Sequence, residues 1–200
     1  MGENRARIFK FNYITVMEER INQIFLENRE LLAKIDVSSR IAEAAEMLVE
    51  CFRNGGKVLI CGNGGSMAEA EHFSGELVAR FRRERRGLPA ITLGSNAAVL
   101  SAWSNDYDYR TALAREVEAL GNSGDVLIVM STSGNSANVI EAVKMAKHRS
   151  MKVIGFLGEG GALREMADVV LAVPSGNTPR IQEIHLIMVH IISELIEEKI

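Results

Sequence analysis

Several residue types that mark special classes of protein are scarce in this 200-residue chain. It has only two cysteines and three prolines, so neither a disulfide-rich scaffold nor a proline-rich linker is indicated. Lysine and arginine total 23 against 26 acidic residues, and this net charge of −3 argues against a nucleic-acid-binding domain. No apolar run is long enough to span a membrane. We therefore expect no nucleic-acid partner and no membrane association.

The cysteines and the N-terminal residues indicate a cellular compartment. Cys51 and Cys61 lie in apolar segments and form no C-x-x-C pair, so we expect two buried free thiols. The first residues lack an apolar stretch followed by a small-residue cleavage site, which argues against a signal peptide. Both features predict a cytoplasmic protein.

Residues 1–55 have the pattern of two helices, interrupted at residues 36–39. Apolar side chains recur in the first helix at three- and four-residue spacing. The stripe contains Met17, Ile21, Ile24, Phe25, Leu31, Leu32 and Ile35. We expect this pair to be an oligomerisation arm that belongs to the same domain as residues 56–200.

Five short apolar runs follow, separated by helical segments. Each run has four to six residues without polar alternation, which is typical of parallel strands covered on both faces. The runs cover residues 57–62, 90–93, 125–130, 152–157 and 169–173. The pattern predicts an α/β fold: a doubly wound, five-stranded parallel sheet with an N-terminal helical extension. Ligands of such sheets bind beyond the carboxyl ends of the strands.

Two of these strand ends carry loops that suit a phosphate group. In C-G-N-G-G-S at 61–66, three glycines let the backbone approach a ligand, and Ser66 with Glu69 predicts a capping box on the next helix. In S-T-S-G-N-S at 131–136, four hydroxyls precede another helix. A plain tight turn and a capping loop are the simpler interpretations. Together, the two loops predict a phosphorylated small molecule held between them.

These loops and R-I-Q-E-I-H at 180–185 resemble the sugar isomerase (SIS) domain family over essentially the whole chain. Residues 72–76 and 182–190 are most similar to members that act on seven-carbon sugar phosphates. The resemblance implies a flavodoxin-like sheet and an aldose–ketose isomerase. Its reaction converts sedoheptulose 7-phosphate to D-glycero-D-manno-heptose 7-phosphate through an enediol and feeds ADP-heptose and lipopolysaccharide core synthesis. The alternative is a non-catalytic SIS module that binds a sugar phosphate or a partner protein such as the replication initiator DnaA.

The acid/base residues favour the enzyme over that module. His72 and Glu76 are four residues apart and share one helix face, where they can bind zinc or transfer protons, although an exposed pair without a role is the alternative. We assign Glu76 as the base at carbon and His190 as the acid/base at the oxygens. The resemblance implies one zinc ion per site, with ligands among His72, Glu76, Gln182 and His190.

The resemblance also implies the substrate contacts. Ser66, Ser131, Thr132, Ser133 and Ser136 are assigned to the phosphate, Gly64 and Gly65 to its loop, and Asn63, Glu76, Asn105, Asp106 and Gln182 to the rest of the sugar. Met67 and Pro179 stand where related enzymes often have His and Asp. Five arginines between residues 80 and 86 are interpreted as a solvated helix end, with attraction of a phosphorylated substrate as the alternative.

Helix length raises a question about the zinc ligands. Gln182 and His190 are eight residues apart, about 12 Å along one helix. They reach one ion only if the side chains lean together or if two subunits contribute. The final helix, from about residue 180 to 198, is apolar on most faces, and the first helix has its own stripe. We therefore expect a homo-oligomer, a tetramer with shared active sites, in which His190 or Gln182 meets His72 and Glu76 of another subunit.

Overall fold

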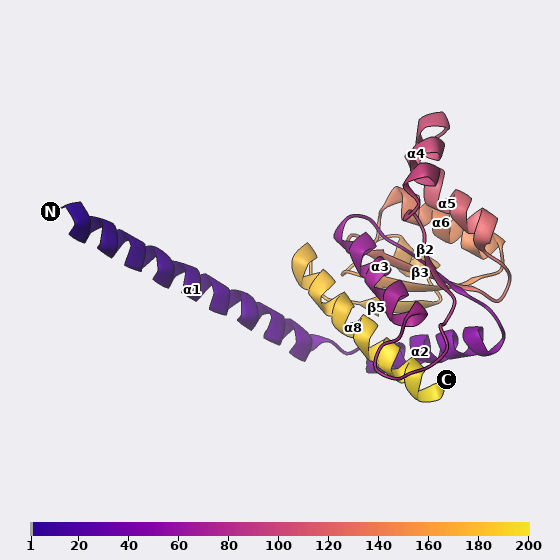
Figure 1. Cartoon of the computed structure of the whole chain (residues 1–200), viewed down its shortest axis with the longest axis horizontal. Coiled ribbons are helices and arrows are strands. Elements are labelled where there is room, and N and C mark those ends of the chain that lie inside the picture. Colours follow the sequence, from indigo (N-terminus) through magenta and orange to yellow (C-terminus); the bar gives the residue numbers. More distant parts are fainter. Residues whose placement is uncertain (1) are drawn as a thin grey trace. The chain divides into compact units, whose positions relative to one another are not determined.

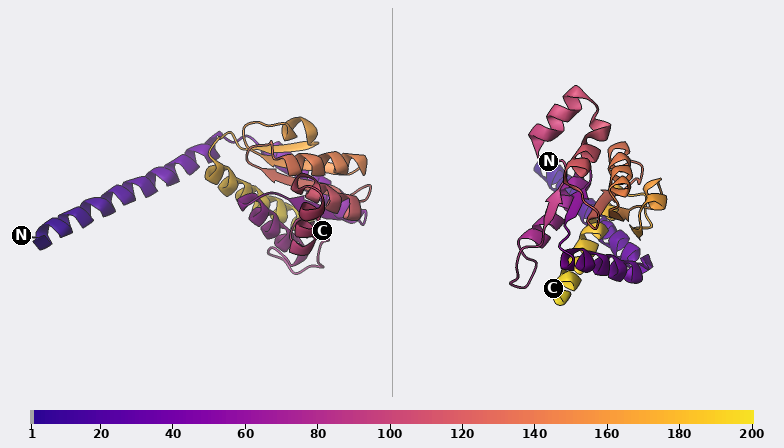
Figure 2. Two further views of the ribbon diagram at one scale, coloured as in Figure 1. Left: turned by 90° about the horizontal axis from the view of Figure 1, so that it is seen from above. Right: turned by 90° about the vertical axis from the view of Figure 1, so that its right-hand side faces the viewer.

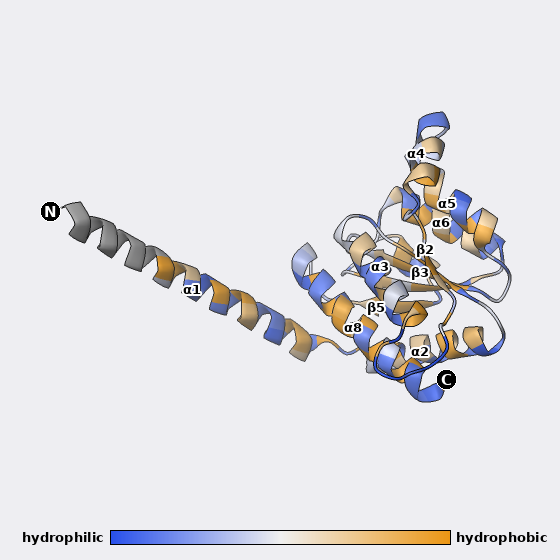
Figure 3. Ribbon diagram, viewed as in Figure 1, coloured by the Kyte–Doolittle hydropathy of each residue, from blue (hydrophilic) through white to orange (hydrophobic). Residues whose placement is uncertain are grey.

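The computed structural model describes residues 2–200, with side chains in the first helix described from residue 14 onward. The chain divides after Ile35 into two units. The first unit is one helix, α1 (Gly2–Lys34), and orange on its ribbon in Figure 3 marks apolar residues. Its exposed apolar residues are Ile14, Val16, Met17, Ile21, Phe25 and Leu32. Met17, Ile21, Phe25 and Leu32 belong to the predicted stripe, whereas Leu31 of that stripe is buried.

The second unit is built around a parallel sheet (Figure 1). Its strands are β1 (Val58–Cys61), β2 (Ala90–Thr92), β3 (Val126–Ser131), β4 (Lys152–Leu157) and β5 (Val169–Ala172). They are ordered β2-β1-β3-β4-β5, and every pair is parallel. The order reverses beside β1, so the loops after β1 and β3 meet at one edge of the sheet. The predicted α/β fold is confirmed.

Helices cover both faces of this sheet (Figure 2), which explains why the strands lack polar alternation. On one face lie α2 (Ser38–Arg53), α3 (Gly65–Val78) and α8 (Thr178–Lys199), and α8 packs against both of the others. The other face carries α5 (Tyr109–Leu120), α6 (Ala137–His148) and the short α7 (Leu163–Met166), while α4 (Ala97–Asp106) packs on α5. Every residue of β1 and β3 is buried.

The second helix of the predicted arm, α2, belongs to the compact unit. It buries Ala44, Leu48 and Phe52 and packs against α8 and β5. The compact unit therefore begins at residue 36, and the role of residues 1–55 in assembly stays a prediction. Cys51 and Cys61 are free and buried, as expected, and burial raises their thiol pKa values to about 11 and about 12. No helix within residues 2–200 is long and apolar enough to cross a membrane.

The start of α3 differs from the sequence-based prediction. The helix begins at Gly65 rather than Ser66, and no side chain caps it, so the predicted capping box of Ser66 and Glu69 is wrong. Gly64 occupies the N-cap position with φ of 55°, a left-handed conformation that favours glycine. The turn is therefore closed by backbone geometry, and the Ser66 and Glu69 side chains take other positions.

Candidate active site

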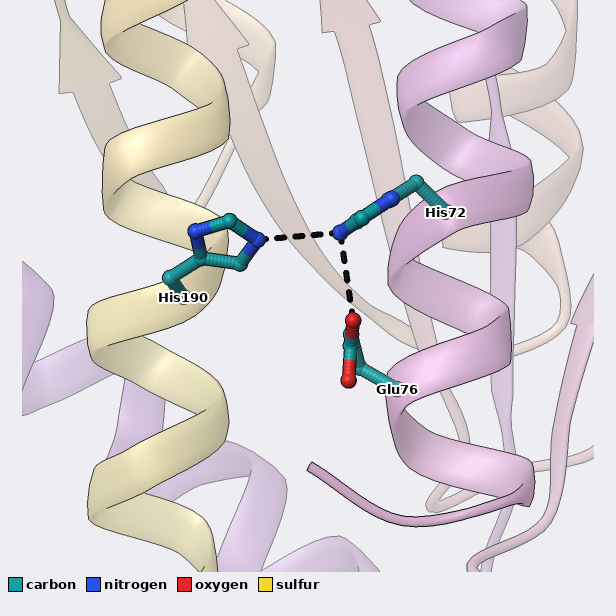
Figure 4. A group of neighbouring side chains, drawn as sticks. All are labelled: His72, Glu76 and His190. Carbon is teal, nitrogen blue, oxygen red and sulfur yellow. Dashed lines mark hydrogen bonds and ion pairs between the residues drawn. The ribbon is translucent and has the colours of Figure 1, made fainter. Parts of the chain in front are cut away.

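His72, Glu76 and His190 form a cluster between α3 and α8 (Figure 4). The Nε2 atom of His72 lies 2.9 Å from Nε2 of His190 and 3.2 Å from a carboxylate oxygen of Glu76. The Glu76 side chain is 20% exposed and that of His72 is 42% exposed, so the cluster faces solvent. Two imidazoles and a carboxylate in contact can accept, donate and pass on protons.

The four predicted metal and acid/base residues lie at two levels along α3 and α8. Gln182 is beside the start of α3, where its Nε2 donates to Oγ of Ser66 at 3.3 Å. His190, two helical turns later, meets His72, which is six residues after Ser66. The two helices therefore run in the same direction. The separation of Gln182 and His190 along α8 corresponds to the separation of their partners, Ser66 and His72, along α3.

This arrangement corrects one prediction about shared sites. His190 meets His72 and Glu76 within a single chain, so no second subunit is needed to bring these three residues together. The expectation was wrong because it assumed that Gln182 and His190 must both reach one zinc ion. Gln182 instead lies over Gly65, where an added Cβ would come within 2.5 Å of its amide. Gln182 as a fourth ligand stays a prediction.

The donor set of the cluster fits a zinc ion. One ligand atom each from His72, Glu76 and His190 lie within 4.8 Å of one another. Two nitrogens bound to a tetrahedral zinc ion at ~2 Å are about 3.3 Å apart, close to the observed separation of the imidazoles. Imidazole nitrogen and carboxylate oxygen are zinc's usual ligands, and catalytic sites keep a fourth position open.

The loop after β3 presents its hydroxyls at the start of α6. Ser131 is buried, and its Oγ lies 3.3 Å from Oγ of Ser136 and accepts a hydrogen bond from the backbone N–H of Gly134. Ser133 is exposed, and its hydroxyl accepts from the N–H of Asn135. Ser136 occupies the N-cap position but makes no side-chain cap, so capping of α6 does not account for this serine.

Asn63 connects the two loops through residues that the sequence analysis missed. Its Nδ2 donates to Asn138 at 2.9 Å, and its Oδ1 accepts from Asn138 at 2.8 Å and from the Tyr109 hydroxyl at 2.9 Å. Asn138 is buried on α6 and Tyr109 begins α5. Beside the loop lies a cavity of about 80 Å³ that Met67 helps to line. Only its position, two residues after Ser136, marks Asn138 in the sequence; residues 131–136 are called the serine loop below.

Asn105 and Asp106 are exposed residues at the end of α4, and this helix lies away from α3 and α8 in Figure 1. Asn105 donates to the Asp106 carboxylate at 2.8 Å. The same helix carries Trp103, which stacks on Tyr107 with ring centroids 4.2 Å apart and donates to the Thr111 hydroxyl. Within one chain, Asn105 and Asp106 are not brought to the cluster of His72, Glu76 and His190.

Two further titratable groups lie near these elements. Burial raises the pKa of Glu69 to about 7 against a smaller lowering effect of the Ser66 side chain, and both of its carboxyl oxygens are buried. His185 is fully buried on α8, and burial lowers its pKa to about 4. Its Nε2 lies 3.2 Å from the Leu157 carbonyl, so the neutral ring donates there and has a structural role.

The arginine run is not a helix end. Helix α3 ends at Val78, and residues 80–86, which we call the arginine loop, continue beyond it toward α8. Arg82 is exposed as expected, but the Arg85 side chain is only 9% exposed and pairs with Glu197 of α8 at 3.0 Å. Phe81 was missed as well, and it stacks on His190. These contacts join residues more than a hundred positions apart, which no local pattern reveals.

Comparison with known proteins agrees with this geometry. Residues 25–158 match the model of the family described as the SIS domain. The chain belongs to the SIS domain family. The resemblance seen in the two loops is thereby confirmed, and the SIS domain places both loops at the carboxyl edge of its sheet.

Several relatives of this SIS domain are named phosphoheptose isomerase. A phosphoheptose isomerase of Roseiflexus sp. (strain RS-1) is 50% identical over 177 residues, which are 84% of this chain and 90% of that protein. One from Helicobacter pylori (strain P12) is 45% identical over 91% of this chain and 96% of its own length. The solved phosphoheptose isomerase of Francisella tularensis is 40% identical, with a TM-score of 0.88 over 91% of this chain and 98% of its own.

Proposed function

We propose that this SIS protein is a phosphoheptose isomerase, which interconverts sedoheptulose 7-phosphate and D-glycero-D-manno-heptose 7-phosphate. The observation that carries the proposal is the contact of Glu76 and His190 with His72, in a chain 45–50% identical to proteins of that name. A non-catalytic SIS module needs the two loops but has no use for this acid/base cluster.

Isomerisation moves one proton between adjacent carbons, and the cluster supplies groups for each step. The Glu76 carboxylate removes a proton from C1 of the ketose, the electron pair forms the C1–C2 double bond, and His190 protonates the oxygen on C2. The resulting enediol then loses the proton of its C1 hydroxyl to His190, while Glu76 returns its proton to C2. The products are the aldose and the original protonation states.

The two loops hold the distant phosphate. Ser131, Thr132, Ser133 and Ser136 surround the start of α6, and Ser66 lies at the start of α3 with Gly64 and Gly65. Hydroxyls and free backbone N–H groups at helix N-termini bind phosphate without a basic residue. Asn63 and Gln182 lie at the same edge and are proposed to bind sugar hydroxyls.

We also propose one zinc ion per site, which His72, Glu76 and His190 would hold. A metal-bound imidazole nitrogen cannot accept a proton, so zinc binding alternates or competes with proton transfer by Glu76 and His190. When bound, zinc acts as a Lewis acid that stabilises negative charge on a sugar oxygen. The donor set and spacing support this assignment. His72 would then hold the metal, and without zinc its contact with Glu76 orients the carboxylate.

Assembly is the remaining part of the proposal. Exposed apolar side chains on α1, such as Phe25 at 69% exposed, and Ile187 and Ile191 on α8 support a homo-oligomer, for which we propose a tetramer. Asn105 and Asp106 then reach the site of a neighbouring subunit, since they lie away from the cluster in their own chain. We propose a cytoplasmic location, where buried free thiols stay reduced.

The proposed activity is tested by incubating the protein with sedoheptulose 7-phosphate and measuring the aldose. We expect turnover, and we expect Glu76→Gln to lower kcat by roughly 10²–10⁴-fold because the shape is kept and the base is lost. Glu71→Gln, an exposed change on the same helix, is the control. Binding of the sugar phosphate without turnover, with or without zinc, contradicts the proposal and favours the non-catalytic module.

A further inference from the structure

The arginine loop is fixed to α8 by one buried carboxylate. The Glu197 side chain is 2% exposed. Its Oε1 accepts hydrogen bonds from the backbone N–H of Phe81 at 2.8 Å and from Nε of Arg85 at 3.0 Å. Its Oε2 accepts from the N–H groups of Arg82 and Arg83 at 2.8 and 2.9 Å. Four donors on one buried carboxylate define the path of the loop, and they lower the pKa of Glu197 against the effect of burial.

Arg85 extends this connection to α3. Its Nη1 donates to the Leu77 carbonyl at 2.9 Å, and its Nη2 donates to the carbonyl of Glu76 at 2.7 Å. These are carbonyls of the last turn of α3, which lack partners within the helix. Arg85 and Glu197 therefore connect the turn that carries Glu76 to the helix that carries His190.

The same loop delivers an aromatic ring to the cluster. Phe81 stacks on the imidazole of His190 with ring centroids 5.6 Å apart and planes inclined by 27°. His190 meets His72 through its Nε2 and at a steeper angle of 55°. Its ring is thus contacted by Phe81 from the loop and by His72 from α3.

We propose that Phe81 is a positioning residue that sets the orientation of the His190 ring, and that the Arg85–Glu197 pair holds Phe81 in place. The inference deepens the proposed function, on which its kinetic test rests. A ring packed against one face of an imidazole restricts its rotation, and Nε2 is then kept aimed at His72 and Glu76. Groups that orient a proton-transfer residue or metal ligand typically contribute 10–100-fold to activity or metal affinity.

Phe81→Leu and Phe81→Tyr test the role of the ring. Leucine keeps apolar bulk but loses the flat surface, so we expect kcat to fall roughly 10-fold with KM within about twofold, because the phosphate loops are untouched. Zinc affinity, measured with a competing chelator, should fall by about the same factor. Tyrosine should restore both values. A purely structural role lowers the melting temperature and leaves kcat and zinc affinity of the folded protein unchanged.

Arg85→Gln provides a second route that leaves Phe81 intact, and the chain offers a matched control. Arg82 lies on the same loop and pairs with Glu194 of α8 at 2.6 Å, but its side chain is 67% exposed. We expect Arg85→Gln to reproduce the loss of kcat and zinc affinity, while Arg82→Gln behaves as the wild type, because exposed pairs contribute little. Equal behaviour of the two variants overturns the proposal.

The inference and the proposed function fail in different ways. Imidazole ¹H–¹⁵N spectra, with the His190 signal assigned through His190→Gln, report ring orientation without any substrate. We expect the His190 signal to shift in Phe81→Leu and Arg85→Gln and to stay in place in Phe81→Tyr and Arg82→Gln. A wild-type protein without isomerase activity contradicts the proposed function alone. An unmoved His190 signal with unchanged zinc affinity in Phe81→Leu contradicts the inference alone.

Discussion

Glu69 lies three residues before His72 on α3, and both of its carboxyl oxygens are buried. Burial raises its pKa from 4.5 to about 7. The folded protein therefore binds more protons than the unfolded chain between these values. The contribution of the protonated Glu69 carboxyl group to the free energy of unfolding is complete below pH 4.5 and is lost as pH rises through 7.

Replacing this carboxyl group with an amide should remove that pH dependence. We expect the free energy of unfolding of Glu69→Gln, relative to wild type, to rise by about 1–3 kcal/mol between pH 4.5 and pH 8. His185 titrates in the same range with the opposite sign, since its pKa is lowered to about 4, but it is present in both proteins and cancels. Urea unfolding of the metal-free proteins measures the difference. Parallel curves contradict the prediction, and exposed Glu71→Gln is the control.

The position of a functional side chain was predictable where it depends on spacing along one helix. His72 and Glu76 share a helix face because they are four residues apart, and the structure finds them in contact. Glu69 was expected to cap the helix, because Ser66 lies three residues earlier and the two residues fit the capping-box motif. The motif does not encode the left-handed Gly64 that closes the turn instead, so the burial of Glu69 was not foreseeable.

At the scale of elements, the loop after β3 depends on its contact with the loop after β4. Gly134 has φ of 65°, and an added Cβ would lie 2.2 Å from the Gly160 carbonyl oxygen. That neighbour is backbone and cannot rotate away. The two loops therefore fit together only because Gly134 has no side chain at this contact.

Gly134→Ala should disturb this contact and the serine loop with it. Left-handed strain and the clash together should lower the free energy of unfolding by about 1–3 kcal/mol and weaken binding of the sugar phosphate. Gly160→Ala is the matched control, because nothing lies within 4 Å of its added Cβ. Thermal unfolding and equilibrium binding measure the two effects. Equal stability of the two variants contradicts the argument.

Elements were predictable from periodicity, but their contacts were not. Five apolar runs and the helices between them define the doubly wound sheet, and its loops after β1 and β3 follow from that topology. The pairing of Arg85 with Glu197 spans 112 positions and depends on how α3 and α8 pack. The same packing brings His190 to His72 within one chain. The eight-residue spacing of Gln182 and His190 had instead favoured a contact between two subunits.

For the whole molecule, the question is what a second chain contributes. The cluster of His72, Glu76 and His190 is complete in one chain, whereas Asn105 and Asp106 lie elsewhere on α4. If those residues reach a neighbouring site, two inactive chains complement each other only when their defects lie in different parts of that site.

Co-assembled Glu76→Gln and Asp106→Asn chains should therefore recover about a quarter of wild-type activity by random mixing. Co-assembled Glu76→Gln and His190→Asn chains should recover none, because both residues serve the same chain's cluster. Light scattering must first show an assembly larger than the 22.0 kDa chain. A monomer, or equal recovery from the two mixtures, contradicts the shared site.

The stacking of Trp103 has a spectroscopic consequence. It is the only tryptophan of the chain, and it lies two residues before Asn105 on α4, between the Tyr107 ring and the Arg115 guanidinium group. Indole emission responds to changes in such neighbours, while the sheet and the His72 cluster contribute no indole signal. Tryptophan emission of this protein therefore reports on α4 and its contacts with α5, and a substrate that engages Asn105 changes this emission without any added label.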